Sequence, residues 1–577
     1  MPRSPSGWPV LLHGWIDNLP DLQVALGLNG VSAATTFGAA VERWGRDADA
    51  HVIGTYAAIV CLPDESLRLS RSPWEGFPLF VHRSGPAALV SSLPRALFAA
   101  GVPKRLRSDA VEQMLAMEML ADTESMFEGV ECIPHGSIVT ITGGEMAIDR
   151  WYDPVPSGPI RLARDEDYVE AADALIADSV ASCLRDCEKP AMSLSGGLDS
   201  PIVTAEILRQ LPNGRLLPSF TFRPHPEWDG IVKSGGFGDD WPWVQEFTKQ
   251  YPNLEAHPVR VDGLAFDDKA EALFLATDMG HPSRVLSTVY HPVLTAAREA
   301  GCDIVLSAGF GNLSFSSMAP WAYAEFLREG RWGQLRKLLL HKGDPRSPLR
   351  KFVAECLVPS LPRPAQSLYR DALARLRGGD RLANPFLAKD GPLGQYRQRE
   401  NIAANFSAVG IGKSREEVIR EQYHGAGLHA EVGLGLEQVF GMPHRDVTAY
   451  RPLIEFCNAI PTDQFVRNGE RRFLARRMAK GRMPEAQRTN TLYGQHNVDW
   501  HARMTPRLDD WRAEVRRIAD HPELGALLDT QAMSAALDAW PDRTPTDPYH
   551  CDRLRFYLPA AIYMRRYVDA MTGRNAE

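Results

Sequence analysis

Apolar runs of strand length alternate with stretches of helical spacing between residues 166 and 307, and this alternation constrains the fold most. The helical periodicity predicts helices over residues 166–187, 201–211, 243–251 and 293–301. The apolar runs predict strands over residues 190–194, 216–222, 257–261 and 303–307. Such alternation is typical of βαβ units on a parallel sheet, whose ligands bind at the carboxyl ends of the strands. We therefore expect ligand loops directly after Leu194, Phe222 and Leu306.

The residues before 150 show a different pattern. Short apolar runs at 51–62, 78–81, 87–91 and 137–141 are separated by Pro, Gly and Asp, which predicts antiparallel strands and few helices. Residues 151–159 contain three prolines and a glycine, which exclude a helix and favour an extended linker. We predict an α/β chain in which a β-rich α+β domain covers residues 1–150. A parallel α/β domain with a helical C-terminal region covers residues 160–577.

Composition and charge exclude several classes of protein. The 577 residues suffice for two to four domains at about 150 residues each. The formal net charge of −8 disfavours general attraction to nucleic acid, and no apolar run approaches the ~18 residues of a membrane span. The first residues lack the apolar core of a signal peptide, so we expect a cytoplasmic protein. The eight cysteines form no CxxC pair, and we expect Cys183 and Cys187 to pack in a core rather than bind a metal.

Ser195-Gly196-Gly197-Leu198-Asp199-Ser200 lies between a predicted strand and a predicted helix. Adjacent glycines let backbone N–H groups turn inward around an anion, and the hydroxyls and the helix N-terminus add to that site. Asp199 would repel a phosphate unless a divalent cation lay between them, so the pattern implies Mg²⁺ beside a polyphosphate. The alternative is a Gly-Gly turn in which Asp199 or Ser200 only caps the helix.

These six residues match the SGGxDS motif of the ATP pyrophosphatases, and the chain as a whole resembles the asparagine synthetase superfamily. The N-terminal part resembles that superfamily's glutaminase-like (Ntn-type) domain at residues 14–18, 54–57, 71–79, 127–130 and 134–136. The resemblance implies an adenine-nucleotide α-hydrolase-like second domain that uses ATP and Mg²⁺. It also implies Ser195, Asp199 and Ser200 as catalytic residues, and nucleotide contacts from Leu194, Ser195, Gly196, Gly197, Asp199, Ser200, Phe222, Ser307, Ala308, Gly309 and Gly311.

The start of the sequence departs from the superfamily pattern. A glutaminase of this type needs an N-terminal cysteine, whereas the first cysteine here is Cys61. We therefore expect no glutamine hydrolysis and an attacking amine from another source. The β-lactam synthetases and the lasso-peptide cyclases are two branches with that property.

A second departure lies in residues 307–314, Ser-Ala-Gly-Phe-Gly-Asn-Leu-Ser, where the superfamily's synthetases read Ser-Gly-x-Gly-x-Asp. Asn312 or Leu313 stands in place of the acid that binds Mg²⁺, and only the asparagine side chain offers an oxygen. We expect its carbonyl oxygen to be a weaker second metal ligand beside Asp199. The alternative is a turn whose glycines serve backbone geometry only.

The C-terminal third resembles the lasso-cyclase branch. Residues 441–457 resemble that branch's form of a superfamily segment, and Gly494-Gln495 followed by Asp499-Trp500 resembles its "G-L-Q…D-W" segment. The lysine of lactam-forming relatives has no clear counterpart in residues 489–493.

Other charged residues leave several alternatives open. Two basic stretches, 328–351 and 470–482, could face ATP phosphates or an acidic peptide, although solvated helical faces are the alternative. A catalytic base could be one of four histidines near the predicted cleft, namely His281, His291, His444 and His496.

The resemblance implies an ATP-dependent macrolactam synthetase similar to the lasso-peptide cyclases. Its substrate would be a ribosomal precursor peptide, and its partners a leader peptidase and a leader-binding protein. The alternatives are an ammonia-dependent asparagine synthetase, a β-lactam synthetase and a catalytically inactive peptide-binding scaffold. The intact residues of loop 195–200 argue against the scaffold, and the missing second acid argues for it.

Overall fold

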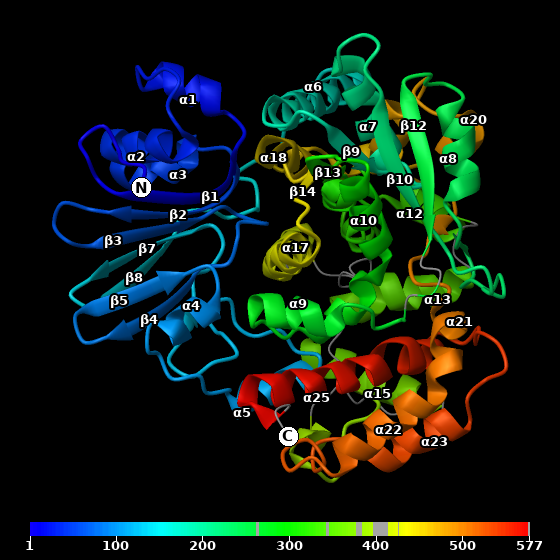
Figure 1. Ribbon diagram of the computed structural model, residues 1–577. Helices are drawn as coiled ribbons and strands as arrows, with labels where there is room; N and C mark the ends of the chain where they lie inside the picture. Colours follow the sequence, from blue (N-terminus) through cyan, green and yellow to red (C-terminus); the bar gives the residue numbers. More distant parts are fainter. Residues whose placement is uncertain are drawn as a thin grey trace.

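The computed structural model describes residues 1–260, 263, 265–341, 346–376, 384–395, 414–424 and 426–574. It contains an N-terminal domain, drawn in blue to cyan in Figure 1, a domain built on a parallel sheet, and a helical C-terminal region. None of the helices in these ranges combines the length and the apolar character that a membrane span needs.

The N-terminal domain contains two antiparallel sheets, in the orders β1-β2-β3-β7-β8 and β5-β4-β6. The strands of the larger sheet are β1 (Val10–Ile16), β2 (Gly54–Cys61), β3 (Leu67–Arg71), β7 (Ser137–Thr142) and β8 (Glu145–Arg150). The smaller sheet consists of β4 (Phe80–Ser84), β5 (Ala87–Ser91) and β6 (Glu131–Cys132). The predicted β-rich character of this part is confirmed. Residues 151–159 contain neither helix nor strand, as predicted.

The expectation of few helices in this part was wrong. The domain contains α1 (Leu19–Ala25), α2 (Ala33–Trp44), α3 (Ala48–His51), α4 (Pro94–Ala99) and α5 (Ser108–Leu115). The longest, α2, begins after the N-cap Ser32, whose side chain accepts the Thr35 N–H at 3.1 Å. It buries Phe37 and Ala40 against Val10 and Tyr56 of the larger sheet, so tertiary packing favours the helix over the weak propensity of its Thr and Gly residues.

The second domain contains the predicted parallel sheet, in the order β12-β10-β9-β13-β14. Its strands are β9 (Pro190–Ser193), β10 (Leu217–Arg223), β12 (Leu254–Arg260), β13 (Ile304–Ser307) and β14 (His444–Asp446). Helix α6 (Asp165–Arg185) precedes β9, and the helices between the strands include α7 (Asp199–Gln210), α8 (Trp241–Thr248) and α10 (His291–Glu299). Residue 261 of the predicted third strand, 257–261, lies outside the described residues. The short strand β14, without an apolar run, was not predicted.

Helices make up most of the remaining chain. They include α9 (Ala270–Thr277), α11 (Ala322–Arg328), α12 (Trp332–Leu339), α13 (Pro348–Phe352), α14 (Val358–Ser360), α15 (Arg363–Leu376), α16 (Arg415–His424), α17 (Ala426–Phe440), α18 (Arg451–Ala459), α19 (Phe473–Met478), α20 (Glu485–Arg488), α21 (Trp500–Met504), α22 (Leu508–Ala519), α23 (Thr530–Asp538), α24 (Pro548–Asp552) and α25 (Leu558–Thr572). Two short parallel strands, β11 (Gly236–Phe237) and β17 (Tyr493–Gly494), pair with each other.

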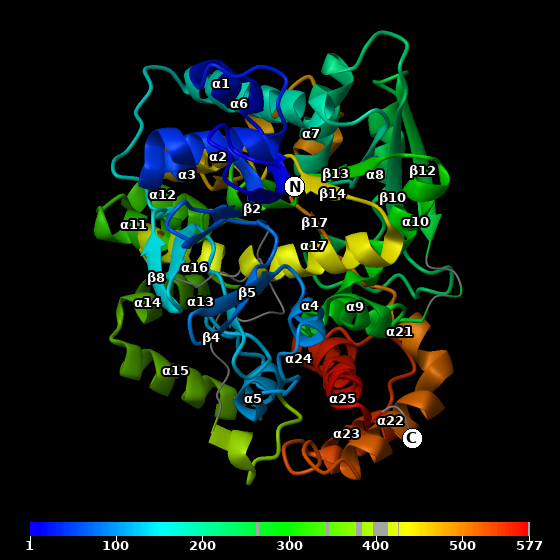
Figure 2. The same ribbon diagram turned by 60° about the vertical axis from the view of Figure 1, so that its left-hand side comes forward.

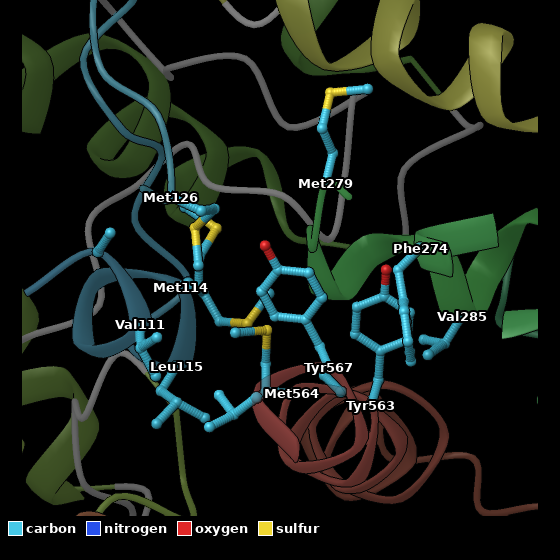
Figure 3. Close-up of a cluster of buried hydrophobic side chains, with 14 of the residues drawn as sticks. Val111, Met114, Leu115, Met126, Phe274, Met279, Val285, Tyr563, Met564 and Tyr567 are labelled. Carbon is cyan, nitrogen blue, oxygen red and sulfur yellow. The ribbon is translucent and has the colours of Figure 1, made fainter. Parts of the chain in front are cut away.

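The helical C-terminal region joins the two domains. Helix α25, red in Figures 1 and 2, lies beside α9 of the second domain and α5 of the N-terminal domain. Figure 3 shows Met114 from α5, Phe274 from α9, and Tyr563 and Tyr567 from α25 in one buried cluster. The Tyr567 hydroxyl donates to the Asp278 carbonyl at 3.0 Å. One core therefore spans all three parts of the chain.

A second contact between the domains lies near the predicted site. Trp74, which is 2% exposed, donates its indole N–H to the Ala449 carbonyl at 2.6 Å. Its ring packs with Tyr423 and belongs to the same apolar cluster as Phe310, which follows β13. The N-terminal domain is thus in contact with a loop at the carboxyl edge of the parallel sheet.

Candidate active site

Residues 195–200 form the turn that leads from β9 into the first two residues of α7, at the carboxyl end of the parallel sheet. The Ser195 N–H donates to Ser200 Oγ at 2.9 Å, and the two hydroxyl oxygens lie 2.9 Å apart. Before the turn, the Leu194 N–H donates to the Phe220 carbonyl at 3.1 Å. The turn therefore places two hydroxyls beside the N-terminus of α7, which is the arrangement expected for an anion site.

Two residues that the sequence analysis did not single out hold this turn. Asp240 accepts the Gly196 N–H at 2.7 Å, and the Gln487 amide donates to the Gly196 and Gly197 carbonyls at 3.2 Å each. Burial raises the pKa of Asp240, while His496 and the Gly196 amide oppose that rise. The shape of the turn is thus fixed from α8 and α20, far away in the sequence.

Asp199 is the buried first residue of α7. Its Oδ2 lies 3.4 Å from Arg472 Nη2, whereas its Oδ1 is buried without a hydrogen-bond partner in the described part of the chain. Burial raises the pKa of Asp199, and Arg472 and the Ser316 hydroxyl oppose that rise. An orphaned carboxylate oxygen beside this turn fits a divalent cation held jointly with phosphate oxygens.

Arg472 precedes α19 with a φ of 56°, a left-handed conformation that is uncommon for a residue with a side chain. Its Nε donates to the Ser316 carbonyl at 3.1 Å, and its Nη2 also donates to the Asn312 side-chain oxygen. A guanidinium in this position can pair with phosphate oxygens as readily as with a carboxylate. Backbone strain of this kind is often found at functional sites.

The loop after β13 forms the other side of the site. Ser307 ends β13, Ala308 follows, and η3 (Gly309–Leu313) is a short 3-10 turn. A Cβ on Gly311 would lie 2.9 Å from Asp199 Cβ, so only glycine lets this turn approach so closely. The two predicted metal ligands, Asp199 and Asn312, therefore both accept a hydrogen bond from the guanidinium of Arg472.

The residues that could hold Mg²⁺ are few. Asp199 offers a free carboxylate oxygen, but the Asn312 carbonyl oxygen is engaged by Arg472. The part of the chain that the structure describes contains no group of three or more His, Cys, Asp or Glu side chains that could hold a metal ion. One carboxylate combined with phosphate oxygens is a common way to bind Mg²⁺, so the residues fit a nucleotide-bound ion.

Two successive segments of the chain match known protein families. Residues 8–152 match the glutamine amidotransferase domain family, and residues 171–422 match the asparagine synthase family. The chain belongs to the asparagine synthetase superfamily.

Individual relatives of this superfamily member are distant. Proteins described as glutamine-hydrolysing asparagine synthetases from Mycobacterium bovis and Mycobacterium tuberculosis are 24% identical over 225 residues. That match covers 37% of this chain and 34% of the relatives, so the chain spans about a third of their length. A solved structure of the U34-tRNA thiolase NcsA from Methanococcus maripaludis is 20% identical and covers 36% of this chain and 65% of that chain, with a TM-score of 0.18.

Within this asparagine synthetase superfamily member, the structure places most of the predicted site residues at one edge of the sheet. Leu194, the turn at 195–200, Ser307, Ala308, Gly309 and Gly311 all lie at the carboxyl ends of β9 and β13. Phe222 lies near the end of β10, and its side chain packs in an apolar cluster with Val293 of α10. Their roles in nucleotide binding stay predictions.

The arginines of the basic stretch at 470–482 have different partners. Arg472 faces the turn, whereas Arg476 donates to the Asn490 carbonyl at 2.8 Å and Arg482 pairs with Asp173 at 2.7 Å. In the other stretch, Arg331 pairs with Asp463, and residue 342 lies outside the described residues. No local pattern in the sequence predicts the left-handed φ of Arg472 or the contact of Gln487 with the turn. Both depend on tertiary contacts.

Two more predictions concern histidines and cysteines. His496 lies close enough to Asp240 to affect its pKa. His291 lies 3.4 Å from Asp268, and burial lowers the pKa of His444 within the sheet. Cys183 is buried and Cys187 half-buried, in line with the expected packing role.

Proposed function

We propose that this chain is an ATP-dependent amide-forming ligase that activates a carboxylate as an acyl-adenylate. The observation that carries this proposal is the convergence of Asp199 and Arg472 on the turn at 195–200. In the first step, a carboxylate oxygen attacks the α-phosphorus of ATP, and pyrophosphate leaves. In the second, an amine attacks the acyl carbon, AMP leaves, and the amine loses a proton.

Each residue of the site has a defined task in this proposal. The hydroxyls of Ser195 and Ser200 and the N-terminus of α7 would bind the pyrophosphate end of ATP. Asp199 would hold Mg²⁺, which neutralises charge on the phosphate oxygens. Arg472 would exchange its contact with Asp199 for one with the leaving pyrophosphate. Burial excludes water from these charges and strengthens their interactions.

More specifically, the acyl group would come from an Asp or Glu side chain of a ribosomal peptide, and the amine from the N-terminus of the same peptide. Support comes from the segment that resembles lasso-peptide cyclases. The Gln495 side chain accepts from the Lys233 N–H and donates to the Lys233 carbonyl, at 3.0 Å each. Asp499 accepts the His225 N–H at 2.9 Å. This segment therefore packs on the loop after β10, beside the proposed nucleotide site.

Ring closure through a peptide's own side chain is entropically costly, so the enzyme must hold the peptide in a folded shape.

The proposal includes a cytoplasmic location, a leader peptidase and a leader-binding protein as partners, and a domain boundary between residues 150 and 160. The main alternative is an ammonia-dependent asparagine synthetase, whose substrates would be aspartate and free ammonia.

The test is ATP-dependent release of pyrophosphate by the purified full chain with Mg²⁺. Candidate leader-cleaved peptides are compared with aspartate plus ammonia, and Asp199→Ala serves as the inactive control. Release that depends on a peptide, with a product lighter by one water, supports the macrolactam synthetase. Release only with aspartate and ammonia supports asparagine synthesis, and no release with any substrate contradicts the ligase.

A further inference from the structure

The turn that carries Asn312 has no capping residue of its own. The residue before η3 is Ala308, whose methyl group cannot accept a hydrogen bond. The first two N–H groups of the turn, from Gly309 and Phe310, nevertheless both have an acceptor. They donate to Oδ2 of Asp446 at 2.5 and 3.1 Å.

Asp446 reaches the turn because of the strand register. It ends β14, opposite Ser307 at the end of β13. The side chain is 8% exposed, and its Oδ2 also accepts the Ser307 hydroxyl at 3.3 Å. A Cβ on Gly309 would lie 2.9 Å from that oxygen, so a larger residue at this position would displace the carboxylate.

The other carboxylate oxygen fixes the orientation of the side chain. Oδ1 of Asp446 accepts the Thr448 N–H at 2.8 Å and the Thr448 hydroxyl at 2.6 Å. Both oxygens are therefore supplied with donors, and neither is left to ligate a metal ion. A buried carboxylate with this many donors holds its partners rigidly.

The Gly309–Leu313 turn contributes to the geometry of the proposed nucleotide site. Gly311 packs against Asp199, and Asn312 accepts from the same guanidinium that faces Asp199. We propose that Asp446 is a positioning residue that holds the Gly309–Leu313 turn against Asp199 and Arg472. It supplies from the neighbouring strand the cap that Ala308 cannot supply. This inference deepens the proposed function and rests on it for its consequence in nucleotide binding.

Asp446→Asn provides the main test, because an amide can accept on only one of its two sides. Hydrogen exchange of the free protein is expected to be at least tenfold faster at the Gly309 and Phe310 amides. Calorimetric titration with Mg·ATP, without carboxylate substrate, is expected to give at least a tenfold higher Kd. Adding Ala308→Ser to this variant supplies a local cap and is expected to restore part of the lost exchange protection.

Two controls separate positioning from general destabilisation. Asp49→Asn removes another buried carboxylate, which pairs with Arg68 in the N-terminal domain, and is expected to lower stability without changing the Kd for Mg·ATP. Thr448→Val removes one donor to Oδ1 and is expected to change the Kd less than threefold. Unchanged exchange of the two amides in Asp446→Asn would overturn the inference. If the unaltered protein binds no Mg·ATP, the proposed function fails, and hydrogen exchange alone still decides the positioning role.

Discussion

Arg472 Nη2 lies 3.4 Å from Asp199 Oδ2, so a guanidinium that precedes α19 is paired with the first carboxylate of α7. We expect Arg472→Ala to reduce ATP-dependent pyrophosphate release by about tenfold to a hundredfold, because charge-assisted contacts contribute roughly 1.5–3 kcal/mol. Arg472→Lys should retain part of the activity. Arg477→Ala is the matched control, since Arg477 donates to the Asp165 carbonyl at 2.8 Å and to Gln464 instead. Equal losses in the Arg477 and Arg472 variants would contradict the assignment.

Asp199→Asn should separate activity from stability. Burial raises the pKa of Asp199, so its ionised form costs folding free energy at neutral pH. The amide removes that cost, and we expect the free energy of unfolding to rise by about 1 kcal/mol while pyrophosphate release falls at least about a hundredfold. Urea denaturation and the release assay measure the two effects. Asp178→Asn, on the exposed face of α6, controls for the change in net charge. A variant that is both less stable and inactive would point to a structural role for Asp199.

The two glycines of the turn should respond differently to a methyl group. A Cβ on Gly196 would lie 2.8 Å from Trp243 Cβ, whereas the nearest atom to a Cβ on Gly197 is Ser195 Oγ at 3.5 Å. We expect Gly196→Ala to raise the KM for ATP at least about tenfold, because overpacking costs about 1–3 kcal/mol and shifts the turn. Gly197→Ala should change it by less than about threefold on the same steric grounds. Steady-state kinetics of both variants check this, and the opposite order would show that the turn has another shape.

Glu75 should make stability depend on pH. It has a φ of 52° in the turn between Trp74 and Gly76, and burial, together with the charge of Asp446, raises its pKa well above the usual range. The folded state then binds the Glu75 proton more tightly than the unfolded state. The stability that Glu75 contributes is therefore fully present below its unfolded pKa and is lost as the pH rises through its folded pKa.

We accordingly expect Glu75→Gln to raise the free energy of unfolding at pH 8 by roughly 1 kcal/mol, and to leave it nearly unchanged at pH 4. Urea denaturation at both pH values checks this. Glu65→Gln is the matched control, because Glu65 also has a left-handed φ, of 63°, but is exposed. A stability gain in Glu75→Gln that is the same at both pH values would exclude titration of Glu75 as its cause.

Local patterns were enough to predict the parallel sheet and the position of the turn at residues 195–200. The strands β9, β10 and β13 are buried apolar runs, and the Gly-Gly pair after β9 is a local signal with a physical reason. Helix α2 was missed because the prediction for this part rested on its strand-like apolar runs. The helix contains two threonines and a glycine of weak helical propensity, and its packing on Val10 and Tyr56 stabilises it. Strand β14 was missed because three polar residues carry no periodicity.

The sequence by itself determined the order of elements, the position of the turn at residues 195–200 and the absence of an acid at residue 312. The tertiary structure decided which distant side chains complete the site. Asp240, Gln487 and Arg472 reach the site, and Asp446 caps the turn after β13, through contacts between segments that are 40 to 300 residues apart in the chain. Such contacts depend on strand register and helix packing. They follow from how the whole core closes, and no local pattern of residues encodes them.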